Sequence, residues 1–194
     1  MPDYFYTVDV VMKNIQKKLI TIVMIDTNIL CRHFKKAYNL RNKLDRSAEK
    51  HWVDLERILR TVAASNVPYK IVSGHHPIYS VGRHGSTQCL IERLLPLLLI
   101  YKVQLYLSGH DHNLQHLDVS NLNSNVDLMI VGSGGKLDGF SENFNLLPSK
   151  CSKFFGTKNG FLNLEISQKS MVTHFIDQDG NYLYSKSFSN KQVV

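Results

Sequence analysis

The segment YKIVSGHHPIYSVGRHG, residues 69–85, decides how the middle of this chain is expected to fold. Its first residues, Tyr69–Ser73, are largely apolar or β-branched and predict a short strand. The strand runs into Gly74 and then into two adjacent histidines, His75 and His76. A strand that delivers histidines to its end indicates a functional loop rather than a simple connection.

A second segment, VQLYLSGHDHNLQHL (residues 103–117), repeats the same design. Val103–Leu107 predicts a strand, and Ser-Gly-His follows it again, with His110 and His112 in the loop. Ligands of open α/β sheets bind outside the carboxyl ends of the strands. We therefore expect the two histidine segments to form one site.

Imidazole is the commonest neutral metal ligand in proteins, so a metal site is the leading interpretation. His110 and His112 are two residues apart and face opposite ways in an extended loop unless the backbone bends. They would serve either one metal through a turn or two neighbouring metals. Gly74 and Gly109 lack a Cβ, which favours a sharp turn and close approach of a ligand. His76 precedes a proline, which favours an extended backbone, and spacing alone assigns it no ligand role.

The other candidate features receive structural interpretations. The segment GSGGK, residues 132–136, lacks the spacing of a phosphate-binding P-loop and is interpreted as a turn at the end of a strand. Four isolated histidines are expected to be surface residues without a role: His33, His51, His116 and His174.

Composition indicates one folded domain spanning residues 1–194. Hydrophobic residues make up 43% of the 194 residues and charged residues 20%, a balance typical of a globular protein. The net charge of +7 favours anionic partners such as a phosphorylated substrate. No nucleic-acid-binding motif occurs, so a specific nucleic-acid partner is not expected. No apolar run reaches the ~20 residues of a membrane-spanning helix, and the N-terminus has no signal-peptide pattern.

The expected elements alternate between strands and helices in the middle and are mostly strands towards the end. One helix begins at Ser47 as its N-cap and ends near residues 65–66, with a buried stripe on one face. A second helical stretch covers Thr87–Tyr101, with a kink or restart at Pro96. The strands expected are Val8–Met12, Lys18–Thr27, Tyr69–Ser73, Val103–Leu107, Leu117–Val119, Val126–Val131, Gly160–Ile166, Met171–Ile176 and Tyr182–Ser187. This order predicts an α/β fold, a layered β-sandwich flanked by helices.

Several motifs in one collinear order resemble a known family. MIDTNILC, GHHP, GHDHN and GSGGK resemble the C-terminal half of the calcineurin-like metallophosphoesterases, and are most similar to tartrate-resistant (purple) acid phosphatases. The resemblance implies the metallophosphatase fold and hydrolysis of phosphate monoesters, including phosphoproteins, by a metal-activated hydroxide. It also implies a secreted or lysosomal location.

The resemblance implies roles for individual residues. His75 and His110 match ligands of one metal of a dinuclear centre, and His112 matches a ligand of the other. The metals are iron with a second iron, zinc or manganese. His84 matches the histidine that binds the phosphate or protonates the leaving group.

The resemblance also assigns the cysteines and one loop. Cys31 and Cys89 match a disulfide pair, which leaves Cys151 free. The basic segment after Cys31 matches an exposed loop that partly covers the active site.

Three motifs of the family do not occur in this sequence: D-x-[GH], GDxxY and GNH[DE], which carry the bridging aspartate and further ligands. The N-terminal half of the domain is therefore expected to be missing, and the strand in LITIVMI to present an exposed edge or face. The alternative to an incomplete phosphatase is a non-catalytic binding or scaffold protein. A further hypothesis is a single zinc held by His75, His110 and His112.

Overall fold

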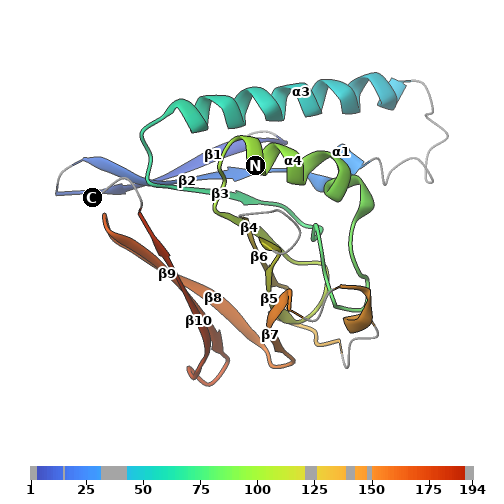
Figure 1. Ribbon diagram of the computed structural model, residues 1–194, viewed down its shortest axis with the longest axis vertical. Coiled ribbons are helices and arrows are strands. Elements are labelled where there is room, and N and C mark those ends of the chain that lie inside the picture. Colours follow the sequence, from blue (N-terminus) through green and yellow to red (C-terminus); the bar gives the residue numbers. More distant parts are fainter. Residues whose placement is uncertain are drawn as a thin grey trace.

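The protein is built in three layers, seen edge-on in Figure 1. The structure, a computed structural model, describes residues 4–14, 16–31, 43–120, 126–138, 143–147 and 150–190, without the side chains of residues 43–48 and 144. A seven-stranded sheet lies between a layer of helices and a three-stranded sheet. The predicted α/β sandwich flanked by helices is confirmed.

The large sheet has its parallel strands in the middle. In spatial order it consists of β1 (Tyr6–Met12), β2 (Lys17–Met24), β3 (Tyr69–Ser73), β4 (Leu105–Ser108), β6 (Asp127–Val131), β5 (Leu114–Asp118) and β7 (Ser152–Gly156). The pairs β2–β3, β3–β4 and β4–β6 are parallel, whereas β1, β5 and β7 join antiparallel. The carboxyl ends of β3 and β4, each followed by a histidine segment, therefore meet at one edge of the sheet.

The small sheet covers one face of the large sheet. It is an antiparallel meander of β8 (Gly160–Ile166), β9 (Ser170–Asp177) and β10 (Tyr182–Ser189). Alternate residues of both sheets point into a shared apolar core, because side chains alternate between the two faces of a strand. The buried members of this core are Ile20, Tyr69, Ile71, Leu105, Leu114, Met129, Met171, Phe175 and Phe188.

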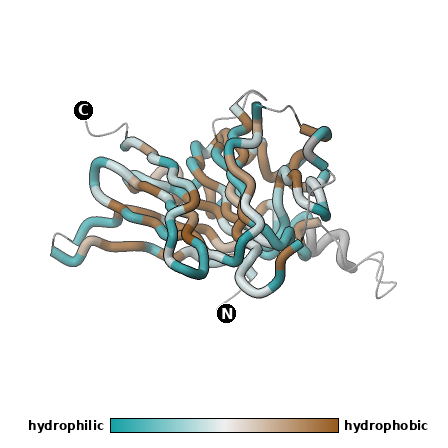
Figure 2. The backbone as a smooth tube through the Cα atoms, turned by 90° about the horizontal axis from the view of Figure 1, so that it is seen from below, coloured by the Kyte–Doolittle hydropathy of each residue, from teal (hydrophilic) through white to brown (hydrophobic). Residues whose placement is uncertain are grey.

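Helices cover the opposite face of the large sheet. They are α1 (Thr27–Cys31), α3 (Lys43–Ala64), the π-helical turn η1 (Leu90–Leu94) and α4 (Leu95–Ile100); a short 3-10 turn, η3 (Phe144–Leu146), lies elsewhere in the chain. The stripe predicted for the long helix is buried against the sheet as Trp52, Leu55, Leu59 and Val62. Figure 2 shows the same arrangement by hydropathy, with hydrophobic stretches along the packed elements and hydrophilic residues at the outer turns.

Two predicted boundaries are wrong for local reasons. The second strand ends at Met24 rather than Thr27, because the Asp26 carboxylate accepts the backbone N–H groups of Asn28 and Ile29 and starts helix α1. Ser47 is not the N-cap of the long helix, which already begins at Lys43. The expected basic loop after Cys31 lies outside the described residues.

The interruption predicted at Pro96 is confirmed as a π-helical turn. Proline lacks an N–H group, and its ring clashes with the carbonyl one turn earlier in a regular α-helix. The chain widens over Leu90–Leu94, where the Leu95 N–H group bonds to the Leu90 carbonyl, and α4 begins directly after it.

The expectation of an exposed strand in LITIVMI is wrong. Strand β1 pairs with the outer edge of β2, and the helices and the small sheet cover its two faces. Leu19, Ile20 and Val23 are each at most 3% exposed. Strand β7 was not predicted, since its five residues carry no alternating pattern.

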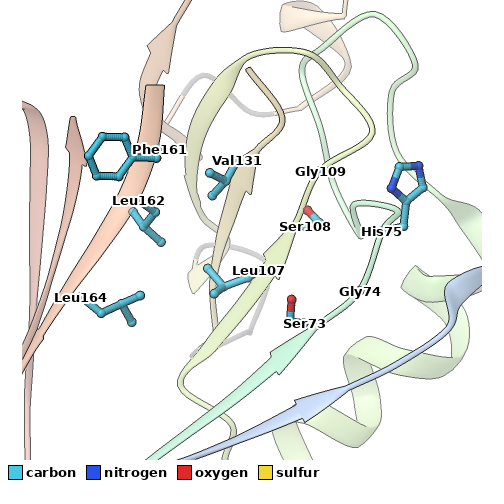
Figure 3. A pocket seen from close by; sticks show the side chains of 10 residues that line it. All are labelled: Ser73, Gly74, His75, Leu107, Ser108, Gly109, Val131, Phe161, Leu162 and Leu164. Carbon is cyan, nitrogen blue, oxygen red and sulfur yellow. The ribbon is translucent and has the colours of Figure 1, made fainter. Parts of the chain in front are cut away.

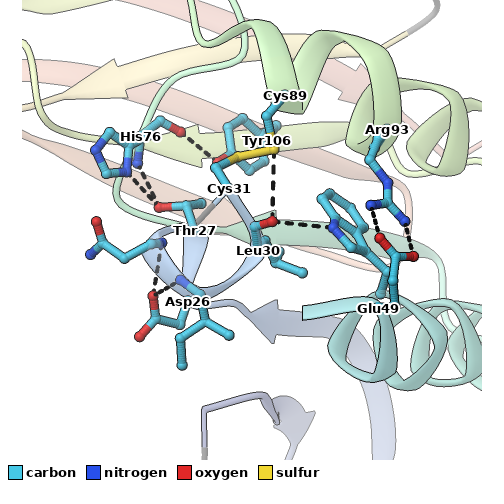
Figure 4. Close-up of a disulfide and its surroundings, with 12 residues drawn as sticks. Asp26, Thr27, Leu30, Cys31, Glu49, His76, Cys89, Arg93 and Tyr106 are labelled. Carbon is cyan, nitrogen blue, oxygen red and sulfur yellow. Dashed lines mark hydrogen bonds and ion pairs between the residues drawn. A yellow bond between two sulfur atoms is a disulfide. The ribbon is translucent and has the colours of Figure 1, made fainter. Parts of the chain in front are cut away.

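The predicted disulfide is present between Cys31 at the end of α1 and Cys89 just before η1 (Figure 4). The two Cα atoms are 5.7 Å apart, and Cys151 is free and buried. The bond therefore ties α1 to the segment between the histidine loop and α4.

Removing this disulfide is expected to destabilise the fold substantially. It closes a loop with a sequence separation of 58 residues, for which loss of unfolded-state entropy corresponds to about 4 kcal/mol. The double variant Cys31→Ser, Cys89→Ser should show this loss in urea unfolding. Cys151→Ser is the control, which shows whether replacing a free cysteine has the same effect. Equal stability of the double variant and the wild type would contradict a stabilising disulfide between Cys31 and Cys89.

The predicted turn between β9 and β10 is built around the buried Asp177. Its carboxylate accepts the backbone N–H groups of Asn181 (2.8 Å) and Asp179 (3.1 Å), and Lys158 Nζ lies 3.0 Å away. The hydrogen bond from the Asn181 N–H has the largest effect on the pKa of Asp177. Together with the other bonds it outweighs the effect of burial and lowers this pKa from 3.8 to about 2. Gly180 adopts φ +85°, which suits glycine.

Because the folded pKa of Asp177 is depressed, its stabilising effect is present above its ordinary pKa and disappears as the pH falls towards 2. Asp177→Asn is therefore expected to lower the melting temperature at pH 6, with the difference from wild type shrinking between about pH 4 and about pH 2. Thermal unfolding monitored by circular dichroism across this range measures it. A difference that stays constant with pH would show that charge on Asp177 does not contribute.

Candidate functional site

The two histidine segments leave the sheet side by side. The Gly74 N–H group donates to the Leu107 carbonyl at 3.0 Å, so β3 and β4 stay paired up to their ends. One step further, the Gly109 N–H group donates to the His75 carbonyl at 3.0 Å. This backbone hydrogen bond thus fixes the two histidine loops to each other.

Three histidines gather at this edge: His75, His76 and His110. One ring nitrogen from each lies within 4.8 Å of those of the other two. Nε2 of His75 is 3.1 Å from Nδ1 of His110, and the ring centroids of His76 and His110 are 4.4 Å apart. His75 is exposed, His110 half-buried and His76 buried, so the cluster opens to solvent on one side.

The loop after β4 bends at His110 itself. This residue has φ +69°, the left-handed region that side chains other than glycine adopt rarely. Because of this bend, the loop is not extended, and the side chains of His110 and His112 are not forced to face opposite ways. Gly109 was expected to supply the turn, but a Cβ there would meet only the Val131 and His75 carbonyls at 3.9 and 4.0 Å.

Gly74 has a packing role instead of a turn role. A Cβ at this position would lie 2.7 Å from Cγ2 of Thr27 and 2.9 Å from both Ile25 Cγ1 and the Tyr106 hydroxyl. The missing side chain therefore lets α1 and β4 close around the base of the histidine loop.

Hydrogen bonds to Thr27 and Tyr106 hold His76 in place, as Figure 4 shows. Its Nδ1 lies 2.8 Å from Oγ1 of Thr27, and its backbone N–H donates to the same hydroxyl at 3.2 Å. The Tyr106 hydroxyl donates to the His76 carbonyl at 2.6 Å. Burial raises the pKa of Tyr106, so the hydroxyl remains a donor. Spacing could not identify His76, since its partners come from distant segments.

A buried carboxylate, Asp111, joins the two histidine loops. Its Oδ1 accepts the His84 N–H at 2.7 Å, and its Oδ2 accepts the Ser80 hydroxyl. Ser80 Oγ in turn accepts from the Gly82 N–H at 2.9 Å and from Nε2 of Gln115 at 3.0 Å. Sequence reasoning passed over Asp111, although a carboxylate between two histidines is a signal for such an anchor.

His84 and His112 lie beside the cluster. The ring of His84 is 4.4 Å from that of His110 and 6.2 Å from that of His112. Nδ1 of His112 lies 3.1 Å from Oδ2 of the buried Asp138. Burial raises the pKa of Asp138, but hydrogen bonds from His112 and the charge of Lys136 outweigh it and lower the pKa overall.

A second group of possible metal-binding atoms comprises His84, Asp111 and Asp138, again within 4.8 Å of one another. Asp111 already accepts from Ser80 and His84, and Asp138 accepts the His112 N–H at 3.3 Å. These existing bonds indicate that the two carboxylates primarily position the loops. An Asp138 carboxylate next to Nδ1 of His112 is also the usual arrangement behind a metal-binding imidazole.

The GSGGK segment is a turn after β6, as predicted. Its first glycine, Gly132, donates its N–H to the Asn113 carbonyl at 3.0 Å. A Cβ on Gly132 would lie 1.9 Å from the Asp111 carbonyl oxygen. The glycine therefore allows the turn to pack directly against the histidine loop.

The remaining histidines differ from one another. His116 was expected at the surface, but it is 1% exposed and bonds to Asp127 Oδ1 at 2.6 Å and to the Tyr184 hydroxyl at 2.8 Å. It stabilises the contact between the two sheets. His51 contacts aromatic rings near the N-terminus, His174 bonds to Ser185, and His33 lies outside the described residues.

A hollow of about 440 Å³ adjoins the histidine cluster. In Figure 3, Leu162 and Leu164 of β8 face Leu107 and Val131 across it, while His75 lies on the far side of the strand ends. The hollow is apolar on its β8 side, so its chemistry differs from that of the histidine cluster.

The geometry of the histidine cluster suits metal binding. Imidazoles from two strand-end loops, open to solvent and backed by buried carboxylates, suit a divalent transition metal. Such an ion lowers the pKa of a bound water and polarises a phosphate ester. A sandwich of two sheets with these histidines at the strand ends is therefore a candidate metal site.

Comparisons with known proteins give the family. A profile of the calcineurin-like phosphoesterase family matches residues 3–114, more than half of the chain. Tartrate-resistant acid phosphatase type 5 of Sus scrofa is 34% identical over 169 residues, which are 85% of this chain and 49% of the relative. The chain belongs to the calcineurin-like phosphoesterase family. It spans about half the length of the curated relatives that it matches.

Two solved structures share the fold. The structure described as GAP50, the anchor in the inner membrane complex of Plasmodium, superposes with a TM-score of 0.80 at 32% identity over 98% of this chain and 56% of that one. A purple acid phosphatase from yellow lupin superposes with a TM-score of 0.71 at 18% identity, covering 95% of this chain and 32% of that one. Among the residues that the structure describes, no helix combines the length and apolar character needed to cross a membrane.

Proposed function

We propose that this chain carries the histidine-bearing part of an acid phosphatase that hydrolyses phosphate monoesters with a metal-activated hydroxide. The observation that supports the proposal most is the convergence of His75 and His110, whose ring nitrogens are 3.1 Å apart. The two residues come from the ends of two neighbouring parallel strands, where ligands of such sheets bind.

The proposed roles follow the positions of the side chains. His75 and His110 bind one metal, and His112, with Asp138 behind its Nδ1, binds the other. Metals held by these residues would polarise a phosphate ester and lower the pKa of a bound water that attacks it. His84, whose ring centroid lies 4.4 Å from that of His110, would bind the phosphate or protonate the leaving group. The metals would be iron with a second iron, zinc or manganese.

A complete dinuclear centre also needs a bridging carboxylate and further ligands. D-x-[GH], GDxxY and GNH[DE] segments do not occur in these 194 residues. We propose that sequence outside the 194 residues supplies these ligands in an active enzyme. The Cys31–Cys89 disulfide and the family resemblance favour a secreted or lysosomal protein, since disulfides persist in oxidising compartments. Phosphomonoesters, including phosphoproteins, are the proposed substrates.

A non-catalytic scaffold is the second candidate. It is favoured by the likeness to the Plasmodium anchor protein at 32% identity across 98% of this chain. In such a protein the fold would be kept for binding, and the histidine cluster need not turn over a substrate.

Release of p-nitrophenol from its phosphate ester at acidic pH separates the two functions. In a protein that includes the further ligands, the enzyme proposal predicts metal-dependent turnover that falls at least about 100-fold in His110→Ala. The matched control is His174→Ala, which removes an imidazole on β9 and should leave turnover unchanged. Turnover unaffected by His110→Ala would contradict the assigned site. A protein that binds metal but releases no phosphate would support the scaffold.

A further inference from the structure

We propose that His76 completes a mononuclear metal site with His75 and His110, so that the 194-residue chain binds one transition-metal ion without help from other sequence. The inference builds on the metal role proposed above for His75 and His110. It differs from the set His75, His110 and His112 by its third ligand.

The distances favour this set. Zinc binds imidazole nitrogens at about 2.0–2.1 Å, which places two nitrogens of a tetrahedral site roughly 3.3 Å apart. His75 Nε2 and His110 Nδ1 are already 3.1 Å apart, and one nitrogen of His76 lies within 4.8 Å of both. The group that meets this limit contains His76 and not His112.

His76 is also positioned as metal-binding histidines are. A ligating imidazole commonly bonds through its second nitrogen to a fixed polar group, which sets the ring orientation and the tautomer. Thr27 Oγ1 provides that group at 2.8 Å from Nδ1, and the proposal assigns Nε2 to the cation. Thr27 is 1% exposed, and the Tyr106 hydroxyl fixes the His76 carbonyl, so the ring is held before a metal arrives.

The remaining two ligands can adjust to an ion. His75 is exposed and His110 half-buried, whereas His76 is buried. A cation would therefore be seated on the fixed His76 ring while His75 and His110 rotate to close the shell. The solvent side leaves a fourth position for water, as in zinc sites with three protein ligands.

Titration of the purified 194-residue chain with Co²⁺ and Zn²⁺ tests the inference, with stoichiometry from calorimetry and geometry from the visible absorption of bound Co²⁺. We expect one ion per chain, with affinity at least about 100-fold weaker in His76→Asn and His110→Asn. Asparagine at position 76 keeps a polar atom near Thr27, so loss of binding reports on the lost ring nitrogen. Thr27→Val should weaken binding about 10-fold, because the ring loses its orienting hydroxyl.

His51→Asn is the matched control and should bind as wild type, and His112→Asn tests the alternative third ligand. Thermal unfolding of each variant verifies that the fold is kept. Wild-type affinity in His76→Asn, with loss in His110→Asn, would overturn the role of His76 and leave the metal role of His110 in the proposed function standing. Equal loss in His112→Asn and His76→Asn would also overturn it. Absence of binding in the wild type would overturn this inference and leave the proposed function standing, because that function draws further ligands from outside the 194 residues.

Discussion

Gly132→Ala is expected to lower the free energy of unfolding by about 3 kcal/mol and to weaken metal binding. The added Cβ would lie 1.9 Å from the Asp111 carbonyl oxygen and 2.9 Å from its carbonyl carbon. These are backbone atoms of the loop that carries His110 and His112, so the contact cannot be relieved by rotating a side chain. Either the turn after β6 or the histidine loop must move.

The same segment offers a control of identical chemistry. A Cβ on Gly134 meets no atom within 4 Å, so Gly134→Ala should change the stability by no more than about 0.5 kcal/mol. Urea unfolding of both variants, followed by metal titration, measures the contrast. Equal stability of the two variants would mean that the turn does not pack on the loop as described.

Asp111→Asn is expected to destabilise the protein by about 3 kcal/mol. Ser80 Oγ accepts hydrogen bonds from the Gly82 N–H and from Gln115, so its own hydrogen must go to Oδ2 of Asp111. An asparagine amide at this oxygen would place a donor against a donor in a fully buried position. Loss of the charge also weakens the bond from the His84 N–H.

The control for Asp111 is Asp54→Asn on the solvent side of α3. Asp54 pairs with exposed Arg57 at 2.9 Å, and such surface pairs contribute about 0–1 kcal/mol. Denaturant unfolding should therefore separate the two variants clearly. If Asp111→Asn were as stable as Asp54→Asn, the buried network would not hold the two histidine loops together.

Most of the helices and strands could be predicted from regular patterns in the sequence. The Trp52 to Val62 stripe, strand β8 and the β9–β10 turn each follow from local periodicity or turn chemistry, and the structure has them as predicted. The disulfide came from the family resemblance instead. Strand β7 and the early start of α3 were missed, since neither has a local pattern that distinguishes it.

The site could be predicted only in part, because its missing members depend on tertiary contacts. His75 and His110 were expected to meet, since both follow parallel strands that end at one edge. His76 joins them through Thr27 and Tyr106, residues 49 and 30 positions away in the sequence. The bend at His110 likewise depends on its φ of +69°, which no residue pattern indicates.

Anomalous diffraction from crystals of the zinc-loaded 194-residue chain, collected on both sides of the zinc absorption edge, tests the central claim most directly. Imidazoles from the β3 and β4 loops are expected to share one ion, with a single peak within about 2.1 Å of a nitrogen of His75, His76 and His110. A peak elsewhere in the molecule, or no peak at saturating zinc, would contradict a metal site at these strand ends.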